Sequence, residues 1–174
     1  LPGIAAGNPI LGYATDNALL PKILFMVILA PVIEEYIFRK QLIDRMHVYG
    51  EKLAVITSAL MFGLFHGNLS QLFYAFALGL VFGYVYLKTG KLRYSISLHM
   101  LINFIGSVAG PFFLEKIAVL GTMETLDMVA LESIMPWLIG FGAYVLVLIG
   151  LAITGLVLLC INKRRVSFAP AELE

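Results

Sequence analysis

The chain has 174 residues, of which 60% are hydrophobic and 13% are charged, and its formal net charge is +1. Soluble domains carry about 25% charged residues, and a water-soluble chain of this size cannot bury so much apolar surface. The near-neutral charge argues against nucleic acid as a partner. We therefore expect an all-α protein embedded in the lipid bilayer.

Long uncharged stretches predict a polytopic transmembrane helix bundle with about five spans. No charged residue lies between Lys52 and Lys88, between Arg93 and Glu115, or from Ser133 to Asn162. A helix needs about 20 mainly apolar residues to cross a bilayer core, so the first stretch must hold two crossings. The predicted spans are 20–46, 51–67, 69–88, 93–110 and 134–161.

The other segments flank a transmembrane core at 20–162. We expect residues 1–19 to be an extramembrane N-terminal segment, and because the sequence starts at Leu1 without Met, we expect further helices upstream. The charged segment 111–133 is predicted to be an outer loop with room for one amphipathic helix. Residues 163–174 are predicted to be a basic tail.

The basic residues indicate an orientation for these spans. With the C-terminus in the cytoplasm, ten of the twelve Lys and Arg residues lie toward the inner face, and only Lys22 and Lys116 lie outside. This asymmetry follows the positive-inside rule, and an even number of spans would destroy it. We expect an integral protein of a bacterial cell membrane with a cytoplasmic C-terminus.

The first predicted span contains three ionisable groups, Glu34, Glu35 and Arg39. A charge at the bilayer centre costs at least about 2.5–3.5 kcal/mol, so these groups need partners or water. Glu35 and Arg39 are four residues apart on one helix face and can form an ion pair. Glu34 is offset by about 100° around the helix, which leaves it free to face a cavity.

Two further spans carry His66 and the pair His99 and Asn103. Each could be structural, because intramembrane His and Asn side chains often form hydrogen bonds between helices. Together with Glu34 they place ionisable groups on three spans, and such groups mark functional sites by default. A shared site requires either that the break after His66 lies deep in the membrane or that the helices are short and staggered, and we predict a buried break at 67–70. A shared site also requires the two imidazoles to lie within about 12 Å of each other.

These side chains suit peptide hydrolysis. Glu34, helped by His66, would take a proton from water as a general base, and His99 with Asn103 would donate hydrogen bonds to the oxyanion. A zinc ion held by Glu34, His66 and His99 is the alternative. The helix-borne HExxH zinc motif is absent from the sequence, so the version without a metal or other cofactor is favoured.

Three motifs in this order resemble those of the CAAX-protease and bacteriocin-processing family, also called the Abi family, of intramembrane endopeptidases. They are an EExxxR motif at Glu34–Arg39, an FxxxH motif at Phe62–His66 and an HxxxN motif at His99–Asn103. The resemblance covers about 20–110. It implies that Glu34 and His66 activate water, that His99 and Asn103 form the oxyanion site, and that Glu35 and Arg39 support them.

The leading hypothesis is thus an intramembrane endopeptidase that cleaves a peptide bond at or near the membrane surface. Its substrate would be a peptide or a membrane-anchored protein, prenylated in some members of the family. A proton-coupled transporter, with Glu34, His66 and His99 as a relay, is one alternative. A non-catalytic immunity or scaffold protein that keeps the helices is the other.

Overall fold

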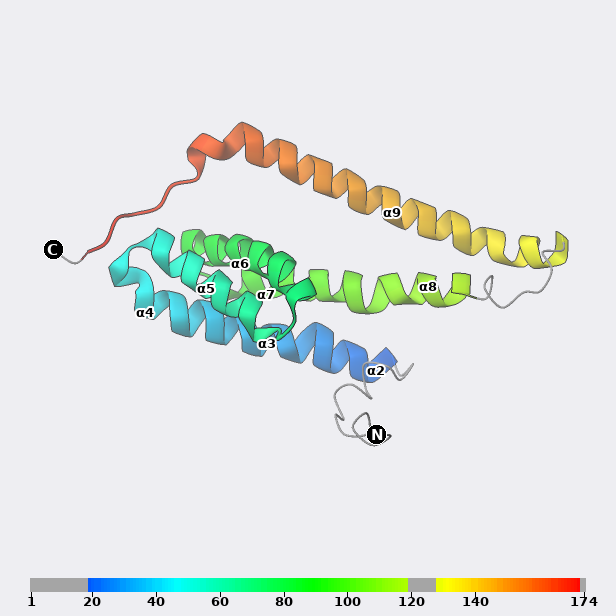
Figure 1. The fold of residues 1–174 in the computed structure, drawn as a ribbon, viewed down its shortest axis with the longest axis horizontal. Coiled ribbons are helices and arrows are strands. Elements are labelled where there is room, and N and C mark those ends of the chain that lie inside the picture. Colours follow the sequence, from blue (N-terminus) through cyan, green and yellow to red (C-terminus); the bar gives the residue numbers. More distant parts are fainter. Residues whose placement is uncertain (1–18, 119–127, 173–174) are drawn as a thin grey trace. The chain divides into compact units, whose positions relative to one another are not determined.

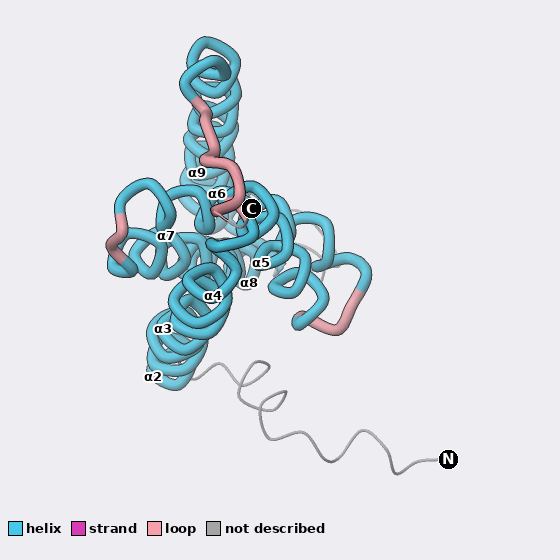
Figure 2. The backbone as a smooth tube through the Cα atoms, turned by 90° about the vertical axis from the view of Figure 1, so that its left-hand side faces the viewer, coloured by secondary structure: helices cyan, strands magenta, loops and turns pink. Residues whose placement is uncertain are grey.

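The structure, a computed structural model, describes residues 19–118 and 128–172. Within these residues every regular element is a helix, and short loops join the helices (Figure 2). This confirms the predicted all-α architecture. The chain divides into two compact units. The first unit comprises residues 1–108 and 168–174, and the second comprises residues 109–167.

In chain order the helices are α2 (Leu19–Pro21), η1 (Lys22–Leu29), α3 (Ala30–Glu35), η2 (Tyr36–Ile43), α4 (Asp44–Met46), η3 (His47–Tyr49), α5 (Glu51–Phe65), α6 (Leu69–Thr89), α7 (Leu92–Phe104), η4 (Ile105–Ala109), α8 (Gly110–Ala118), α9 (Met128–Asn162) and η6 (Lys163–Arg165).

Three helices among the described residues are long and apolar enough to cross a membrane. They are Leu69–Thr89, Leu92–Ala118 and Leu131–Arg165, and they correspond to three of the five predicted spans. The other two predicted spans, 20–46 and 51–67, are helical over most of their length. Helix α5 has 15 residues, fewer than the roughly 20 that a perpendicular crossing needs. The helices therefore form a membrane bundle in which the first two predicted spans are atypical.

The first predicted span forms a run of consecutive helical segments from α2 to α4 (Figure 1). Two of them, η1 and η2, are π-helical and flank the six-residue α3. Proline has no N–H to donate to the preceding turn, and Pro31 is the second residue of α3, so the widened turns of η1 end just before it. Such turns frequently occur at functional sites, and here they bracket Glu34 and Glu35.

Helices α5 and α6 pack tightly and antiparallel around a short turn. Gly67 takes a positive φ of 69°, and Asn68 caps α6 by accepting a hydrogen bond from the Gln71 backbone N–H at 2.8 Å. A Cβ on Gly79 would come within 2.9 Å of the Ala59 backbone, so only glycine permits this approach. The close contact fixes the position of α5 against α6.

The break at 67–70 occurs where the sequence predicts it, but protein does not cover it. Gly67, Asn68, Leu69 and Ser70 are all exposed, and the expected depth of this break in the membrane stays a prediction. The polar groups satisfy one another instead, because Ser70 donates its hydroxyl hydrogen to Asn68 at 2.8 Å. The turn therefore needs no partner from another helix.

The predicted outer loop at 111–133 is largely helical in the second unit. Helix α8 covers 110–118 and α9 begins at Met128, while residues 119–127 lie outside the described part. Aromatic contacts explain the added helix, since Phe113 packs on Tyr144 with ring centroids 5.4 Å apart. Likewise Phe112 meets Trp137 at 5.8 Å. The aromatic side chains of α8 are thus in contact with α9, although no residue of α8 is fully buried.

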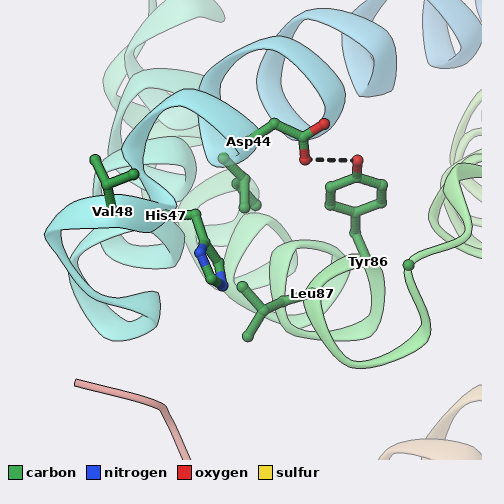
Figure 3. Close-up of a pocket in the computed structure, with 7 residues that line it drawn as sticks. Asp44, His47, Val48, Tyr86 and Leu87 are labelled. Carbon is green, nitrogen blue, oxygen red and sulfur yellow. Dashed lines mark hydrogen bonds between the residues drawn. The ribbon is translucent and has the colours of Figure 1, made fainter. Parts of the chain in front are cut away.

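The other end of the first unit holds a small cavity of about 230 Å³ between α4, η3 and α6. Figure 3 shows Tyr86 reaching across to Asp44, to which its hydroxyl donates a hydrogen bond of 2.7 Å. The predicted basic tail returns to this end of the unit, where Ala169 accepts a hydrogen bond from the Glu51 backbone N–H at 3.2 Å. These contacts lie at the α4–α5 connection, away from the charged residues of α3.

Candidate active site

A buried ion pair lies at the centre of the site. The Arg39 Nε–H donates to Glu35 Oε2 at 2.9 Å, and a second guanidinium N–H donates to Oε1 at 3.3 Å. Both side chains have 0% exposed area. Two parallel hydrogen bonds of this kind offset much of the cost of burying the charges. The predicted Glu35–Arg39 pairing is therefore present, and it is inaccessible.

Helix α5 contributes a hydroxyl to this pair. The Nη1 group of Arg39 donates to Ser58 Oγ at 2.7 Å, and Ser58 donates its own hydrogen to the Phe38 carbonyl at 2.7 Å. Ser58 is fully buried. One hydroxyl thus satisfies both a guanidinium donor and a main-chain acceptor that would otherwise be unpaired.

His99 of α7 connects the buried pair to Glu34. Its Nδ1 lies 3.1 Å from Glu35 Oε1, and because a carboxylate can only accept, Nδ1 carries the proton and donates. On the other side of the ring, Nε2 lies 3.7 Å from Glu34 Oε2. His99 is 3% exposed, so its ring is held between two adjacent carboxylates.

Two phenylalanines enclose these polar groups. Phe82 stacks on His99 at 5.3 Å between centroids, and Phe62 meets the same ring edge-on at 5.4 Å. The Arg39 guanidinium lies 4.8 Å from the Phe62 ring centroid, within cation–π range. The aromatic rings exclude water from Glu35, Arg39 and His99 and restrict their side-chain rotation.

Glu34 lies on the opposite side, at a large cavity. The cavity has a volume of about 630 Å³, and its walls include Glu34, His66 and Asn103 together with apolar side chains of η1 and α3. The Glu34 side chain is 17% exposed whereas that of Glu35 is 0% exposed. The predicted rotation of Glu34 away from the ion pair and toward a cavity agrees with this geometry.

His66 terminates α5 at the edge of the cavity. Its Nδ1 lies 2.8 Å from the Phe62 carbonyl and donates to it, so a neutral ring has an unprotonated Nε2. Glu34 is within electrostatic range of both His66 and His99. The available nitrogen of His66 can thus accept a proton from, or share one with, a molecule in the cavity.

Asn103 lies one turn beyond His99 on α7 and also lines the cavity. Its side-chain Nδ2 donates to the Met26 carbonyl of η1 at 2.8 Å, a contact between residues 77 positions apart in the chain. An amide nitrogen has two hydrogens. The bond to Met26 fixes the orientation of the amide and leaves its second N–H for a ligand.

The structure brings all six predicted site residues together, in two groups. The cavity group is Glu34, His66 and Asn103. The buried group is Glu35, Arg39 and His99, joined by Ser58, which was not predicted. The His66 and His99 rings both contact Phe62, at 4.9 and 5.4 Å. Their separation cannot exceed the sum of these distances, which lies within the predicted limit of about 12 Å.

No set of three or more His, Cys, Asp or Glu side chains among the described residues is arranged to hold a metal ion. This includes Glu34, His66 and His99, the ligands considered from the sequence.

Comparisons with known proteins add an independent observation. A family model described as Type II CAAX prenyl endopeptidase Rce1-like matches residues 16–105, more than half of the chain. The chain belongs to this family. The membrane-embedded CAAX protease MroQ of Staphylococcus aureus (strain USA300) is 32% identical over 88 residues, which make up 47% of this chain and 36% of that protein. The match thus spans about a third of that relative's length. No solved structure matches the chain.

The region that matches the Rce1-like family contains both the cavity group and the buried group. Sequence reasoning missed Ser58, because a serine in an apolar span carries no periodic signal and its partner Arg39 is 19 positions away. It also missed Phe82, whose stacking on His99 requires α6 and α7 to be neighbours. Spacing within a single helix cannot reveal contacts of this kind.

Proposed function

We propose that this Rce1-like protein is an intramembrane endopeptidase that hydrolyses a peptide bond at or near the membrane surface, with Glu34 as the general base. The observation that carries this proposal is the single cavity lined by a carboxylate, an imidazole and a carboxamide from three helices. Those three groups are sufficient for water activation and oxyanion stabilisation.

In the first step Glu34 removes a proton from a water molecule in the cavity. The resulting hydroxide attacks the carbonyl carbon of the scissile bond, and the carbonyl oxygen becomes an oxyanion. The unprotonated Nε2 of His66 accepts a hydrogen bond from the same water and orients it. Glu34 and His66 thereby share the task of activating the nucleophile.

The oxyanion is stabilised by hydrogen-bond donors that are already in place. Asn103 donates its second N–H to the oxyanion, a role that is supported by the bond to Met26, which fixes the amide. His99, whose Nε2 lies 3.7 Å from Glu34 Oε2, donates a second hydrogen bond from this nitrogen when the ring carries both protons. Each donor of this type contributes about 2.7–4 kcal/mol to transition-state stabilisation.

Collapse of the tetrahedral intermediate breaks the C–N bond. The protonated Glu34 returns its proton to the leaving amine, so one water is consumed and a carboxylate and an amine are released. Glu35 and Arg39 take no part in proton transfer. They hold His99 in place through the hydrogen bond to its Nδ1.

The cavity suits a substrate that is at least partly apolar, since Phe25, Leu29 and Ile33 form much of its wall. We propose a peptide or membrane-anchored protein substrate, of which a prenylated one is the form that the family name suggests. We also propose a bacterial cell membrane as the location, with a cytoplasmic C-terminus. A reporter fused after Glu174 that is active only in the cytoplasm tests this orientation.

We propose a mechanism without a metal, with zinc bound by Glu34, His66 and His99 as the alternative. Elemental analysis of the purified protein, combined with an assay after chelation, separates the two. Cleavage that persists in chelated protein free of zinc supports the metal-free route. Loss of cleavage that added zinc restores would overturn it.

The central test is Glu34→Gln, assayed with an internally quenched peptide that ends in a prenylated cysteine motif. The exchange keeps the size of the side chain but removes the base, so cleavage should fall by about 100- to 10,000-fold. Glu132→Gln, at an exposed position of the second unit, is the matched control and should cleave normally. Equal activity of the two variants would refute the role of Glu34.

Glu34→Gln and Glu132→Gln also test the two alternative functions, a proton-coupled transporter and a non-catalytic immunity or scaffold protein. A proton-coupled transporter would lose transport rather than cleavage in Glu34→Gln, and an immunity or scaffold protein would show no cleavage before mutation. The cavity wall contains a carboxylate, an imidazole and a carboxamide, and no second helix pair of the transporter type is evident in the described residues. Hydrolysis therefore remains the function that the site supports best.

A further inference from the structure

A continuous chain of hydrogen bonds runs from the backbone of η2 to the ring that faces Glu34. The Phe38 carbonyl accepts from Ser58, Ser58 accepts from Arg39, and Arg39 donates twice to Glu35. Glu35 in turn accepts from His99 Nδ1. Every side chain in this chain is buried. Ser58 is the one residue of α5 in this chain of hydrogen bonds.

Ser58 does not touch the cavity, but it determines where Arg39 can lie. Nη1 has a single partner among the described residues, the Ser58 oxygen at 2.7 Å. That oxygen is itself held, because its hydrogen is committed to the Phe38 carbonyl. Helix α5 is fixed in turn by its approach to Gly79 of α6. The guanidinium is therefore anchored to a rigid pair of helices.

The position of Arg39 is passed on to His99. Arg39 occupies both oxygens of Glu35 from one side, which leaves Oε1 to accept from His99 Nδ1. That hydrogen bond fixes the tautomer of the imidazole and aims Nε2 at Glu34. A change in the angle of the guanidinium would thus rotate the Glu35 carboxylate and release the ring.

We propose that Ser58 is a positioning residue, which sets the orientation of His99 through Arg39 and Glu35. The expected effect of Ser58 on cleavage rests on the proposed function. The expected effect of Ser58 on the orientation of the His99 ring does not. The proposal adds to the motif residues a group from the middle of α5 that sequence spacing does not indicate.

The first experiment is kinetic. Ser58→Ala should lower kcat about 10-fold or more and leave KM unchanged, because Ser58 is not part of the cavity wall. Ser58→Cys keeps a weak donor and acceptor of similar size and should fall between Ser58→Ala and the unmodified protein. A loss confined to KM, or equal activity of all three proteins, would overturn the proposal.

The matched control is Ser95→Ala on α7. Ser95 is also fully buried, but its hydroxyl donates to the Leu92 carbonyl within its own helix and forms none of the hydrogen bonds that lead to His99. Its loss should leave kcat unchanged. If Ser95→Ala lowers kcat as much as Ser58→Ala does, the effect of Ser58 comes from general packing and the positioning role is refuted.

The second experiment does not depend on enzymatic activity. The protein contains three histidines, so ¹⁵N-histidine NMR in nanodiscs can be assigned by single replacement of His47, His66 and His99. Ser58→Ala should shift the Nδ1 and Nε2 signals of His99 and leave those of His47 unchanged. Unshifted His99 signals in a folded Ser58→Ala protein would overturn the proposal.

The two experiments can contradict the protease function and the positioning role independently of each other. If the unmodified protein or Glu34→Gln contradicts the protease function, the NMR result still decides whether Ser58 orients His99. If cleavage depends on Glu34 but neither kcat nor the His99 signals respond to Ser58→Ala, the protease function stands and the positioning role is wrong.

Discussion

Glu34 and Glu35 are adjacent in the sequence and have opposite surroundings. Glu35 belongs to the buried group, where Arg39 and His99 occupy its oxygens and its side chain is fully inaccessible. Glu34 belongs to the cavity group, keeps 17% of its side chain exposed and makes only a long-range contact with His99 at 3.7 Å. A helix separates neighbouring side chains by about 100°, so one turn can supply both a structural and a reactive carboxylate.

This comparison predicts that the buried group controls stability and the cavity group controls catalysis. Variants of Glu35 should therefore lower mainly the free energy of unfolding. Variants of Glu34 and Asn103 should lower mainly kcat. The comparison fails if the two groups respond alike.

The largest expected effect on stability is that of Glu35→Gln. It leaves the Arg39 charge buried and uncompensated, which costs about 3–5 kcal/mol when one partner of a buried ion pair is removed. Denaturant-induced unfolding in detergent micelles measures the loss. Glu34→Gln is the matched comparison and should change the free energy of unfolding by less than about 1 kcal/mol, because the group is partly solvated. The reverse order would invalidate the assignment of the two groups.

Asn103→Ala should have the next largest effect, this time on catalysis. Removal of one oxyanion donor lowers kcat by about 100- to 1,000-fold in comparable sites, and the quenched-peptide assay measures it. Asn162→Ala removes an exposed side chain that bonds only the Leu158 carbonyl of its own helix, and it should leave kcat unchanged. A normal kcat in Asn103→Ala would remove this amide from the oxyanion site.

Tyr86→Phe should have the smallest effect. It deletes the bond from the Tyr86 hydroxyl to Asp44 at the far cavity (Figure 3), while Lys40 still pairs with Asp44 at 2.7 Å. A single hydrogen bond contributes about 0.5–1.5 kcal/mol, so unfolding should become slightly easier and kcat should not change. A marked loss of kcat would show that the far end of the unit is coupled to the site.

Local spacing allowed much of this arrangement to be predicted. The i,i+4 rule predicted the Glu35–Arg39 pair, and the break expected at 67–70 coincides with the turn between α5 and α6. These features depend on residues within one or two turns of each other. The roles assigned to Glu34, His66, His99 and Asn103 stay predictions.

The remaining features depend on how different helices meet. Nothing near Ser58 in the sequence identifies Arg39 as its partner, and nothing near Asn103 identifies the Met26 carbonyl. The helix at 110–118 lies where the sequence left room for one amphipathic helix, but the aromatic contacts that support it come from α9 and could not be predicted. The π-helical turns of η1 and η2 have no recognised local signature beyond Pro31.

Phe62 is in contact with both groups at once. Its ring touches His66 on the cavity side and His99 and Arg39 on the buried side, and in a close-packed interior such a ring cannot turn without displacing its neighbours. A molecule that enters the cavity and displaces His66 will therefore also displace the Phe62 ring, and through it the ring of His99. Occupancy of the cavity should accordingly be detectable at a histidine that the occupant never touches.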